Sequence, residues 1–438
     1  MSIYDYESAF GVEDKTSSAM RKAIDQWFSL YYGEEGDGDP SQRIAYTVVN
    51  KIVKTMFGEY QVAADTEFAK MVARSIAPYR FHAMQMMLVG GECFLKPNPE
   101  PDGFSFTLIP RNNILVFQRN ALGEAVDVGT VERSTFGKHY YTLLERRTVD
   151  AEGFLTIENR LFRSLNAQSL GGEVSLSEHP AYGDLVASHC YERPVGLGLV
   201  SLKTPMLNCV DGTTDGVAVY AAAAGLIRNI DRNEAQLNGE FSRGESRVIV
   251  SADLLDTDKQ FSQNLFVGLD EDPEQVGITL FSPQLREQSF LARKQEYLRN
   301  VESVIGLKRG LLSDANVEER TATEISASAG DYNLTVMDFQ RVWEQALQKI
   351  VVLCGVLWEM YGQGVAEVSS LNVDWGNGIL YDEEKTWQDY MAMVAAGILK
   401  PEIALGWRFN LPADTPEQQA AIRAKMMPAN IVDESAMS

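Results

Sequence analysis

The sequence predicts an α+β fold that combines long helices with two separate β segments. Three observations predict this class. In the N-terminal part apolar residues recur at helical spacing, and short β-rich segments replace them from Glu92 to about Arg163. A second β segment, at 247–283, lies between two further helical patterns. The third observation is a helical pattern from Thr321 to Tyr361, which is longer than most helices of globular proteins.

Three helices are predicted before the first β segment. The first covers Lys15–Tyr32, where apolar residues return after three or four positions. The second begins after an acidic turn, with Asp39 as its cap and Pro40 in its first position. The third covers Thr66–Leu88 and bends near Pro78, because proline removes a backbone donor and clashes with the preceding turn.

The first β segment predicts a small antiparallel sheet. Its β-rich stretches are separated by turn signals. They are Phe104–Ile109, Ile114–Gln118, Tyr140–Arg146 and Phe154–Asn159. The following stretch, Asn166–Leu199, is rich in glycine and predicts loops. Gly196 and Gly198 match a dinucleotide-binding turn only in part and are better explained as turn glycines.

Two helical segments flank the second β segment. The first is predicted at about Asp211–Phe241, and the second at Gln284–Ile305, where Gly306 ends it. Between them, Arg247–Ser251 and Gly277–Phe281 have the composition of strands. The sequence therefore predicts two helices with a small β insertion between them.

The longest predicted helix starts at Thr321. Thr-Ala-Thr-Glu fits a capping box, in which Thr321 accepts from a backbone N–H and Glu324 reaches back to the N–H of Thr321. The apolar positions of one helical face are Ile325, Tyr332, Val336, Phe339, Trp343, Leu347, Ile350, Cys354, Leu357 and Tyr361. About forty residues make a rod roughly 60 Å long. A small enzyme rarely needs such a helix, whereas a large assembly often does.

Cysteine usage and hydropathy exclude several classes of protein. The cysteines, which are Cys93, Cys190, Cys209 and Cys354, lie far apart without a C-x-x-C pair. This spacing indicates a reducing compartment and neither a disulfide framework nor a zinc framework. The first residues lack the pattern of a signal peptide, and the longest apolar runs are too short to span a bilayer.

Catalytic signatures are scarce. The sequence contains no G-x-x-x-x-G-K-[ST] stretch, so it predicts no ATP hydrolysis by a phosphate-binding loop. The histidines, which are His82, His139, His179 and His189, lack the spacing of metal ligands. His189 beside Cys190 is better explained as a surface pair, and the acids at 270–272 and 383–384 as solvated turn and helix-start residues. We therefore predict no catalytic residue, no metal site and no cofactor.

The order of these motifs resembles the portal proteins of long-tailed bacteriophages. The resemblance covers roughly residues 200–427 as ordered motifs, and the first 200 only as a general pattern. It rests on segments that follow one another in the same order as in the family. These are Asp231–Val250, Thr321–Ile325, Val373–Gly376 with Tyr381–Glu384, Val394–Leu399 and Thr415–Ala420.

The resemblance implies an elongated subunit with named parts. Residues 1–210 would form the wing, with N-terminal helices, an antiparallel sheet and loops. The remaining parts would be stem helix 1 at 211–246, the clip at 247–283, stem helix 2 at 284–305, the tunnel loop at 306–320, the long wing helix and following strand at 321–379, and the crown and C-terminal tail at 380–438.

The implied function is mechanical. The protein would form a ring at one capsid vertex, conduct double-stranded DNA during packaging and ejection, and dock the terminase and the head–tail adaptor. Implied partners are further copies of the chain (a dodecamer), double-stranded DNA, the terminase large subunit, the adaptor, and the major capsid and scaffolding proteins, with no membrane. Assembly would take place in the host bacterial cytoplasm and the final location would be the virion. Two alternatives stay open: another minor structural protein of the capsid, and a hydrolase or nuclease.

Three cations of the implied tunnel loop are candidates to face DNA. Lys308 and Arg309 lie between Gly306 and Gly310, whose backbone freedom permits motion, and Arg320 ends the loop. Such cations would contact phosphates without reading base sequence. From spacing alone, a surface loop with cations paired to nearby acids is the better interpretation. Weaker candidates on the stem helices are Arg228, Arg232 and Lys294.

The net charge of −22 argues against a simple DNA-binding surface, which usually carries a basic patch. A channel through which DNA slides must bind DNA only weakly. Every phosphate that a cation neutralises adds affinity, so the channel should carry few cations. An acidic wall with few cations would keep the DNA mobile. Acidity is also common among soluble proteins, so charge alone does not decide between these functions.

Overall fold

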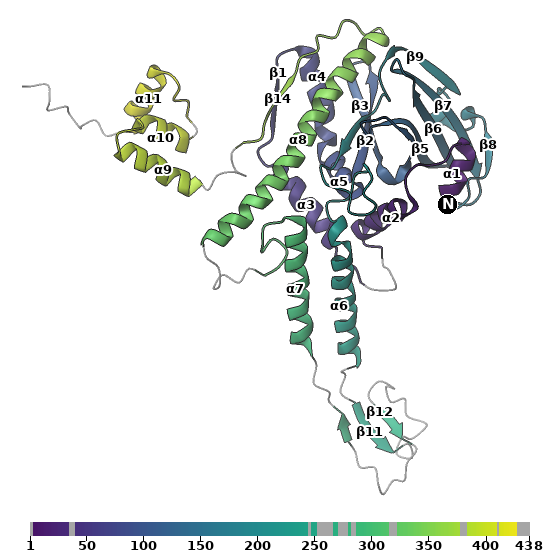
Figure 1. Cartoon of the computed structure of the whole chain (residues 1–438), viewed down its shortest axis with the longest axis horizontal. Coiled ribbons are helices and arrows are strands. Elements are labelled where there is room, and N and C mark those ends of the chain that lie inside the picture. Colours follow the sequence, from purple (N-terminus) through teal and green to yellow (C-terminus); the bar gives the residue numbers. More distant parts are fainter. Residues whose placement is uncertain are drawn as a thin grey trace, which may run out of the picture. The chain divides into compact units, whose positions relative to one another are not determined.

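The computed structural model describes residues 3–34, 40–243, 247–251, 266–269, 279–281, 286–314, 322–376, 383–409 and 411–426. The chain divides into two compact units, Met1–Asp374 and Trp375–Ser438. Figure 1 shows that helices and several antiparallel sheets make up the fold, which confirms the predicted α+β class. Among the described residues, no helix combines the length and the apolar character that a membrane span requires.

The predicted N-terminal helix is present as α2 (Ser18–Tyr32) and follows a short helix α1 (Ile3–Phe10). Ser17 Oγ caps α2 by accepting from the Met20 N–H at 3.1 Å. The buried face of α2 contains every apolar residue that the periodicity indicates, and in addition Arg21. Gly33 ends the helix at φ 65°, in the left-handed region that glycine adopts easily.

The predicted start of the second helix at Pro40 is wrong, because α3 spans Ile44–Met56. Arg43, at φ 55°, stands immediately before the helix. The Gln42 N–H donates to Asp231 Oδ1 at 2.7 Å, and the Arg43 guanidinium donates to the Tyr32 carbonyl. Tertiary contacts therefore hold the segment after Pro40 outside the helix. Asp39, the predicted cap, lies outside the described residues.

The third predicted helix is divided at Pro78, as expected. Its parts are α4 (Glu67–Ile76), the 3₁₀ turn η1 (Ala77–Tyr79) and α5 (Arg80–Gly90). Thr66 Oγ1 caps α4 by accepting from the Ala69 N–H at 3.3 Å. Before α4, strand β1 (Gln61–Ala64) pairs with β14 (Leu371–Asp374).

Two sheets occupy the region for which one small sheet was predicted. The first has the order β10-β2-β3, and the second the order β4-β5-β6-β7-β8, with β9 also paired to β7. Their strands are β2 (Glu92–Glu100), β3 (Gly103–Pro110), β4 (Ile114–Arg119), β5 (Ala125–Phe136), β6 (His139–Val149), β7 (Phe154–Ser164), β8 (Gly172–Val174), β9 (Ser188–Pro194) and β10 (Val200–Lys203). Strands β8 and β9 lie in the stretch predicted to be loops. Gly196 and Gly198 have φ values of 55° and 61° and are turn residues.

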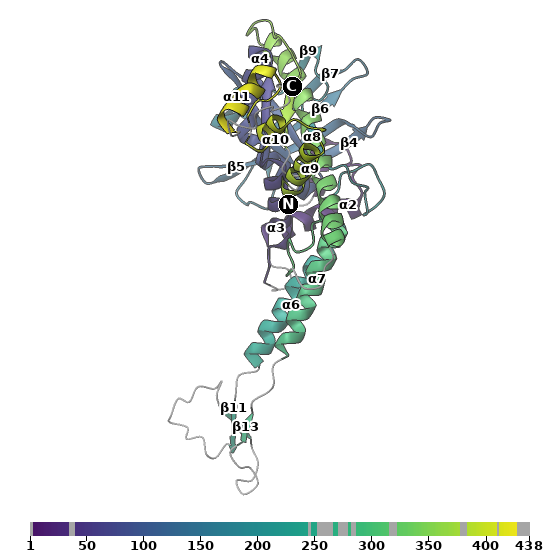
Figure 2. The same cartoon turned by 90° about the vertical axis from the view of Figure 1, so that its left-hand side faces the viewer.

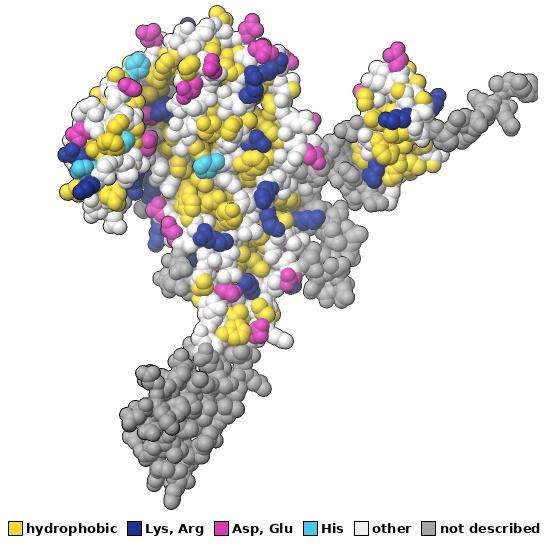
Figure 3. Space-filling model, turned by 180° about the vertical axis from the view of Figure 1, so that it is seen from behind, with side chains coloured by type: hydrophobic (Ala, Val, Ile, Leu, Met, Phe, Trp, Pro, Cys, Tyr) yellow, Lys and Arg dark blue, Asp and Glu magenta, His cyan; other side chains and the backbone are white. Residues whose placement is uncertain are grey.

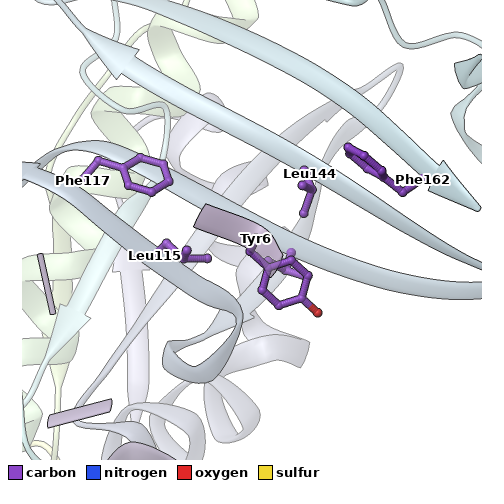
Figure 4. Packing of buried hydrophobic residues seen from close by; sticks show 6 residues of the cluster. Tyr6, Leu115, Phe117, Leu144 and Phe162 are labelled. Atoms are coloured by element: carbon purple, nitrogen blue, oxygen red, sulfur yellow. The ribbon is translucent and has the colours of Figure 1, made fainter. Parts of the chain in front are cut away.

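The larger sheet is covered by α1, whose Tyr6 is 5% exposed. Figure 4 shows Tyr6 among the side chains of the sheet, and the cluster comprises Tyr6, Leu115, Phe117, Val131, Leu144 and Phe162. The free edge of β4 is covered as well. The Lys15 N–H donates to the Val116 carbonyl at 2.8 Å, and the Val116 N–H donates to Asp14 Oδ1 at 3.0 Å.

The first stem-like helix, α6, spans Ala224–Arg243 and does not begin at Asp211 as predicted. The segment from Val217 to Tyr220 is buried but not helical. Just before it, Gly216 approaches Gly91 so closely that a Cβ on either residue would overlap the other backbone. This contact and the hydrogen bond from Thr204 Oγ1 to the Val217 carbonyl (2.8 Å) hold the segment in its non-helical path.

Helices α6 and α7 (Glu287–Ile305) run side by side in both views of Figures 1 and 2. Between them in sequence lies a three-stranded sheet of β11 (Arg247–Ser251), β12 (Phe266–Leu269) and β13 (Thr279–Phe281). Strand β11 is parallel to β12 and antiparallel to β13. The predicted helix–β–helix order is confirmed, with β12 as an additional strand.

The long helix is confirmed as α8 (Ala322–Met360), a helix of 39 residues. Among the described side chains of its predicted apolar face, those from Tyr332 to Leu357 are buried. Tyr361 is an exception, because it lies beyond the helix end and is 55% exposed. Of the predicted capping box, Thr321 and the side chain of Glu324 lie outside the described residues.

The second unit contains α9 (Glu383–Ala395), α10 (Pro401–Arg408) and α11 (Pro416–Met426). Thr415 and Gln418 cap α11 reciprocally. The Gln418 N–H donates to Thr415 Oγ1 at 3.3 Å, and the Thr415 N–H donates to Gln418 Oε1 at 3.1 Å. Glu402 of α10 is buried and pairs with Arg423 of α11, which joins these two helices.

Candidate functional site

The loop after α7 carries two of the cations that the sequence singled out. Lys308 and Arg309 are exposed, and the flanking Gly306 and Gly310 have φ values of 78° and 87°. Both glycines therefore adopt the left-handed conformation that side chains disfavour. Arg320, the third predicted cation, lies outside the described residues.

A buried carboxylate at the end of α7 holds this loop. Glu302 is 1% exposed. Its Oε1 accepts from the backbone N–H groups of Gly310 (3.1 Å), Leu312 (2.6 Å) and Ser313 (2.9 Å). Its Oε2 accepts from the Ser313 hydroxyl at 2.8 Å. Four donors thus surround one carboxylate, and the segment that carries the cations is attached to α7.

Two further contacts tie the loop to neighbouring helices. The Lys51 ammonium of α3 donates to the Leu311 carbonyl at 2.7 Å, and the Asp314 N–H donates to Gln295 Oε1 of α7 at 2.8 Å. The sequence interpretation assigned motion to this loop because of its glycines. In the described part of the loop, up to residue 314, side chains of α3 and α7 form hydrogen bonds with the backbone.

The stem-like helices are joined by ion pairs within the subunit. Lys294 of α7 lies 2.8 Å from Glu234 of α6 and also donates to Gln42 Oε1 at 3.0 Å. Arg286 lies 2.8 Å from Glu240. Lys294, which the sequence placed among weaker DNA-facing candidates, is therefore engaged in holding two helices together. Two further candidates, Arg228 and Arg232, are exposed on α6.

One buried cation before α6 forms structural contacts within the subunit. Arg111 is fully buried and donates to Thr16 Oγ1 at 2.9 Å and to the Ile114 carbonyl at 3.0 Å, with Asp215 3.6 Å away. Burial disfavours the charged form of Arg111 and lowers its pKa, and repulsion from the nearby Arg21 guanidinium lowers the pKa further. These groups fix the segment before α2 against the sheets.

A cleft of about 370 Å³ includes Lys96, Glu145 and Arg147 in its lining. Glu145 lies 2.8 Å from Lys96 and 2.6 Å from Arg147. Burial opposes ionisation of Glu145, but the two cations outweigh it and lower its pKa to about 2. The carboxylate is therefore ionised at neutral pH and already satisfied, which makes it a poor general acid or base.

The histidines and cysteines are not brought together into a site. His179 is buried, accepts from the Ala181 N–H at 3.2 Å and stacks on Tyr182, whereas His189 and Cys190 are exposed. Burial raises the thiol pKa of Cys93 and of Cys354. In the part of the chain that the structure describes, no group of three or more His, Cys, Asp and Glu side chains could hold a metal ion.

Acidic and basic side chains are both spread over the face shown in Figure 3. On that face the described residues mix the two signs of charge with apolar side chains.

Comparison with known protein families gives a match over the second part of the chain. A family model described as phage portal protein, SPP1 Gp6-like, matches residues 165–425, which is more than half of the chain. The matched region contains α6, α7, the intervening three-stranded sheet, the loop after α7 and the whole of α8. The search of curated proteins found no significant match.

Proposed function

Because the chain belongs to the SPP1 Gp6-like family of phage portal proteins, we propose that it acts as the DNA conduit of a bacteriophage capsid. The protein forms a closed ring at one vertex, through which double-stranded DNA enters during packaging and leaves during ejection. Its role is structural, and the work of moving DNA is done by a separate terminase. Cyclic symmetry requires head-to-tail interfaces that close on themselves.

The observation that carries this proposal is the order of elements inside the matched region. Two adjacent helices, α6 and α7, are joined through a small sheet, and a loop then leads to the 39-residue helix α8. This order favours the assignment of α6 and α7 as the stem, the β11–β13 sheet as the clip and α8 as the long wing helix.

The remaining parts follow from the same assignment. The wing would comprise residues 1–210 and the first part of the stem residues 211–246, within which α6 begins at Ala224. Residues 380–438, which belong to the second compact unit, would form the crown and tail. The clip would receive the head–tail adaptor, and the other partners would be the terminase large subunit, the major capsid protein and scaffolding proteins.

Within the ring we assign DNA contact to the loop after α7. Lys308 and Arg309 are exposed there, and one pair from every subunit would form a circle of cations around the channel. Phosphate contacts of this kind are independent of base sequence. An acidic subunit with few such cations lets DNA slide, because affinity grows with every neutralised phosphate. Arg320 would add to the same circle.

Electron microscopy of the purified full-length protein tests the proposal. Class averages of the purified protein should show closed rings with a central channel. In the virion, we expect the ring to contain twelve subunits. A minor capsid protein without a channel, or a compact enzyme, would give a different particle. Light scattering that finds a stable monomer or dimer at high concentration in every salt tried would contradict ring formation.

A further inference from the structure

We propose that Glu302 is the residue that positions Lys308 and Arg309 toward DNA, by holding both ends of the segment that carries them. The inference rests on the proposed function and names the residue that sets the geometry of the loop. Glu302 itself touches no DNA in this proposal. Glu302 acts through the backbone of the loop. Its effect is therefore measured as a change in the yield of crosslinks between position 308 and DNA.

The main chain of Glu302 holds the beginning of the segment. Its carbonyl accepts from the N–H of Gly306 and from the N–H of Leu307, the latter at 2.8 Å. This is the hydrogen-bonding pattern of a helix end with a left-handed glycine. The chain therefore leaves α7 in a fixed direction immediately before Lys308.

The side chain of Glu302 holds the end of the segment. Its carboxylate accepts from the N–H of Gly310 at 3.1 Å, directly after Arg309, and from the N–H groups of Leu312 and Ser313. Between these two anchors, the Leu311 N–H donates to the Lys308 carbonyl at 3.1 Å. The backbone on both sides of Arg309 is thus hydrogen-bonded, either to Glu302 or within the turn.

The position of the Glu302 carboxylate costs free energy unless the loop supplies hydrogen bonds to it. A negative charge is disfavoured in the last turn of a helix, where the backbone carbonyls already concentrate negative charge. Burial adds a desolvation penalty, and Glu302 is 1% exposed. Three backbone N–H groups and the Ser313 hydroxyl meet this cost, and hydrogen bonds to an ionised acceptor are stronger than neutral ones. The anionic side chain and the loop conformation therefore depend on each other.

A mechanical consequence follows for the assembled ring. The cations are attached to α7 through Glu302 and to α3 through Lys51, which contacts the Leu311 carbonyl. A phosphate that pulls on Lys308 thus pulls on the end of a stem helix. The contact with DNA is consequently made by a loop that is anchored to the end of α7.

Photo-crosslinking of DNA-filled particles tests the proposal. A photoreactive amino acid replaces Lys308, and the yield of crosslinks to DNA is measured per assembled ring, with ring integrity checked by electron microscopy. The yield is compared in otherwise unchanged protein and after Glu302→Ala, Glu302→Gln and Glu296→Gln. Glu302→Gln keeps an oxygen acceptor for the loop amides. Glu296 is an exposed carboxylate on the same helix and provides the matched control.

The expected result is that Glu302→Ala lowers the crosslink yield at least about tenfold, because the loss of even one hydrogen bond to a charged acceptor corresponds to a factor of this size. Glu302→Gln keeps one oxygen acceptor but loses the charge, so its yield should lie between that of Glu302→Ala and that of the unchanged protein, and Glu296→Gln should leave the yield unchanged. Hydrogen exchange of residues 310–313 should rise with Glu302→Ala in the same rings. A residue that only stabilised the fold would not change the yield per intact ring.

Two outcomes overturn the inference, and they are distinguishable. An equal crosslink yield with Glu302→Ala would show that Glu302 does not position the cations, while DNA contact by the loop would stand. If position 308 gives no crosslinks even with Glu302 intact, the proposed contact between this loop and DNA is wrong. In that case hydrogen exchange at 310–313 would still show whether Glu302 anchors the loop.

Discussion

Trp343 of α8 donates its indole N–H to the hydroxyl of Tyr60, with 3.0 Å between the two heteroatoms. The indole is fully buried, and its ring meets the Phe57 ring edge-on with the centroids 5.7 Å apart. Phe57 ends α3, and Tyr60 lies just before β1. This contact therefore joins the long helix to the N-terminal helical layer in the interior of the first unit.

Replacement of Trp343 should destabilise the first unit strongly. Trp343→Ala should lower the free energy of unfolding by about 3–5 kcal/mol, because it leaves a large cavity and removes the aromatic contact. Tyr60→Phe should cost about 1–3 kcal/mol, because the buried indole N–H loses its acceptor. Urea denaturation followed by circular dichroism measures both. Equal stability of Trp343→Ala and the unchanged protein would contradict the role of this contact.

The Glu145 ion pairs predict a stability loss in acid. The pKa of this carboxyl is about 2 in the folded protein, below its ordinary value of 4.5. A lowered pKa stabilises the fold at pH above 4.5, and this contribution disappears as the pH falls from 4.5 to 2. Its size is on the order of 3 kcal/mol.

The test compares urea midpoints at several pH values. Glu145→Gln should be less stable at pH 7, because Arg147 and Lys96 lose their partner, and should lose less stability between pH 4.5 and 2. Glu152→Gln, at an exposed turn, is the control and should follow the unchanged protein. An unchanged acid dependence after Glu145→Gln would contradict the low pKa.

Charge reversal at Lys308 and Arg309 together should impair DNA packaging while rings still assemble. In the proposed ring the substitution would replace a circle of cations by anions, and the repulsion would act over a Debye length of about 8 Å at physiological salt. The exposed loop adds little apolar area to any subunit contact. Electron microscopy should show normal rings and few filled heads. Packaging at the unchanged rate would remove the loop from the DNA path, and failure of the rings would place these residues in an interface.

Thr321→Ala should loosen the start of α8 without unfolding the unit. Thr321 precedes Ala322, where α8 begins, and the loss of a helix cap costs about 0.5–2 kcal/mol. The apolar face from Tyr332 onward remains packed, so the effect should be local. Hydrogen exchange should rise at 321–326 and stay constant at 340–350. Equal protection of 321–326 in both proteins would show that Thr321 does not cap the helix.

The helices were predictable where the buried residues are the apolar ones that recur at helical spacing. Trp343 and Ile350 are seven residues apart and are both buried on α8, as the spacing predicts. The start of α6 was not predictable, because the path of the preceding segment depends on the approach of Gly216 to the distant Gly91. Strand β9 was missed because six of its seven residues are exposed and give no alternating pattern.

The cations of the candidate site could be predicted from the sequence, but the residue that anchors their loop could not. Lys308 and Arg309 are recognisable between two glycines, whereas their anchor is a charged residue inside an apolar stripe. Glu302 lies between Leu298 and Ile305, both buried on the same face of α7. A carboxylate in such a place requires nearby donors, but the sequence does not indicate that they come from the following loop.

The covered edge of β4 bears on how identical copies recognise one another. An uncovered strand can recruit the same strand of any neighbour, and head-to-tail recruitment has no inherent end point. Here the main chain of Lys15 and the side chain of Asp14 already satisfy Val116 on that edge. Because this position of the edge is already hydrogen-bonded within the subunit, it is not open to strand pairing with a neighbouring copy.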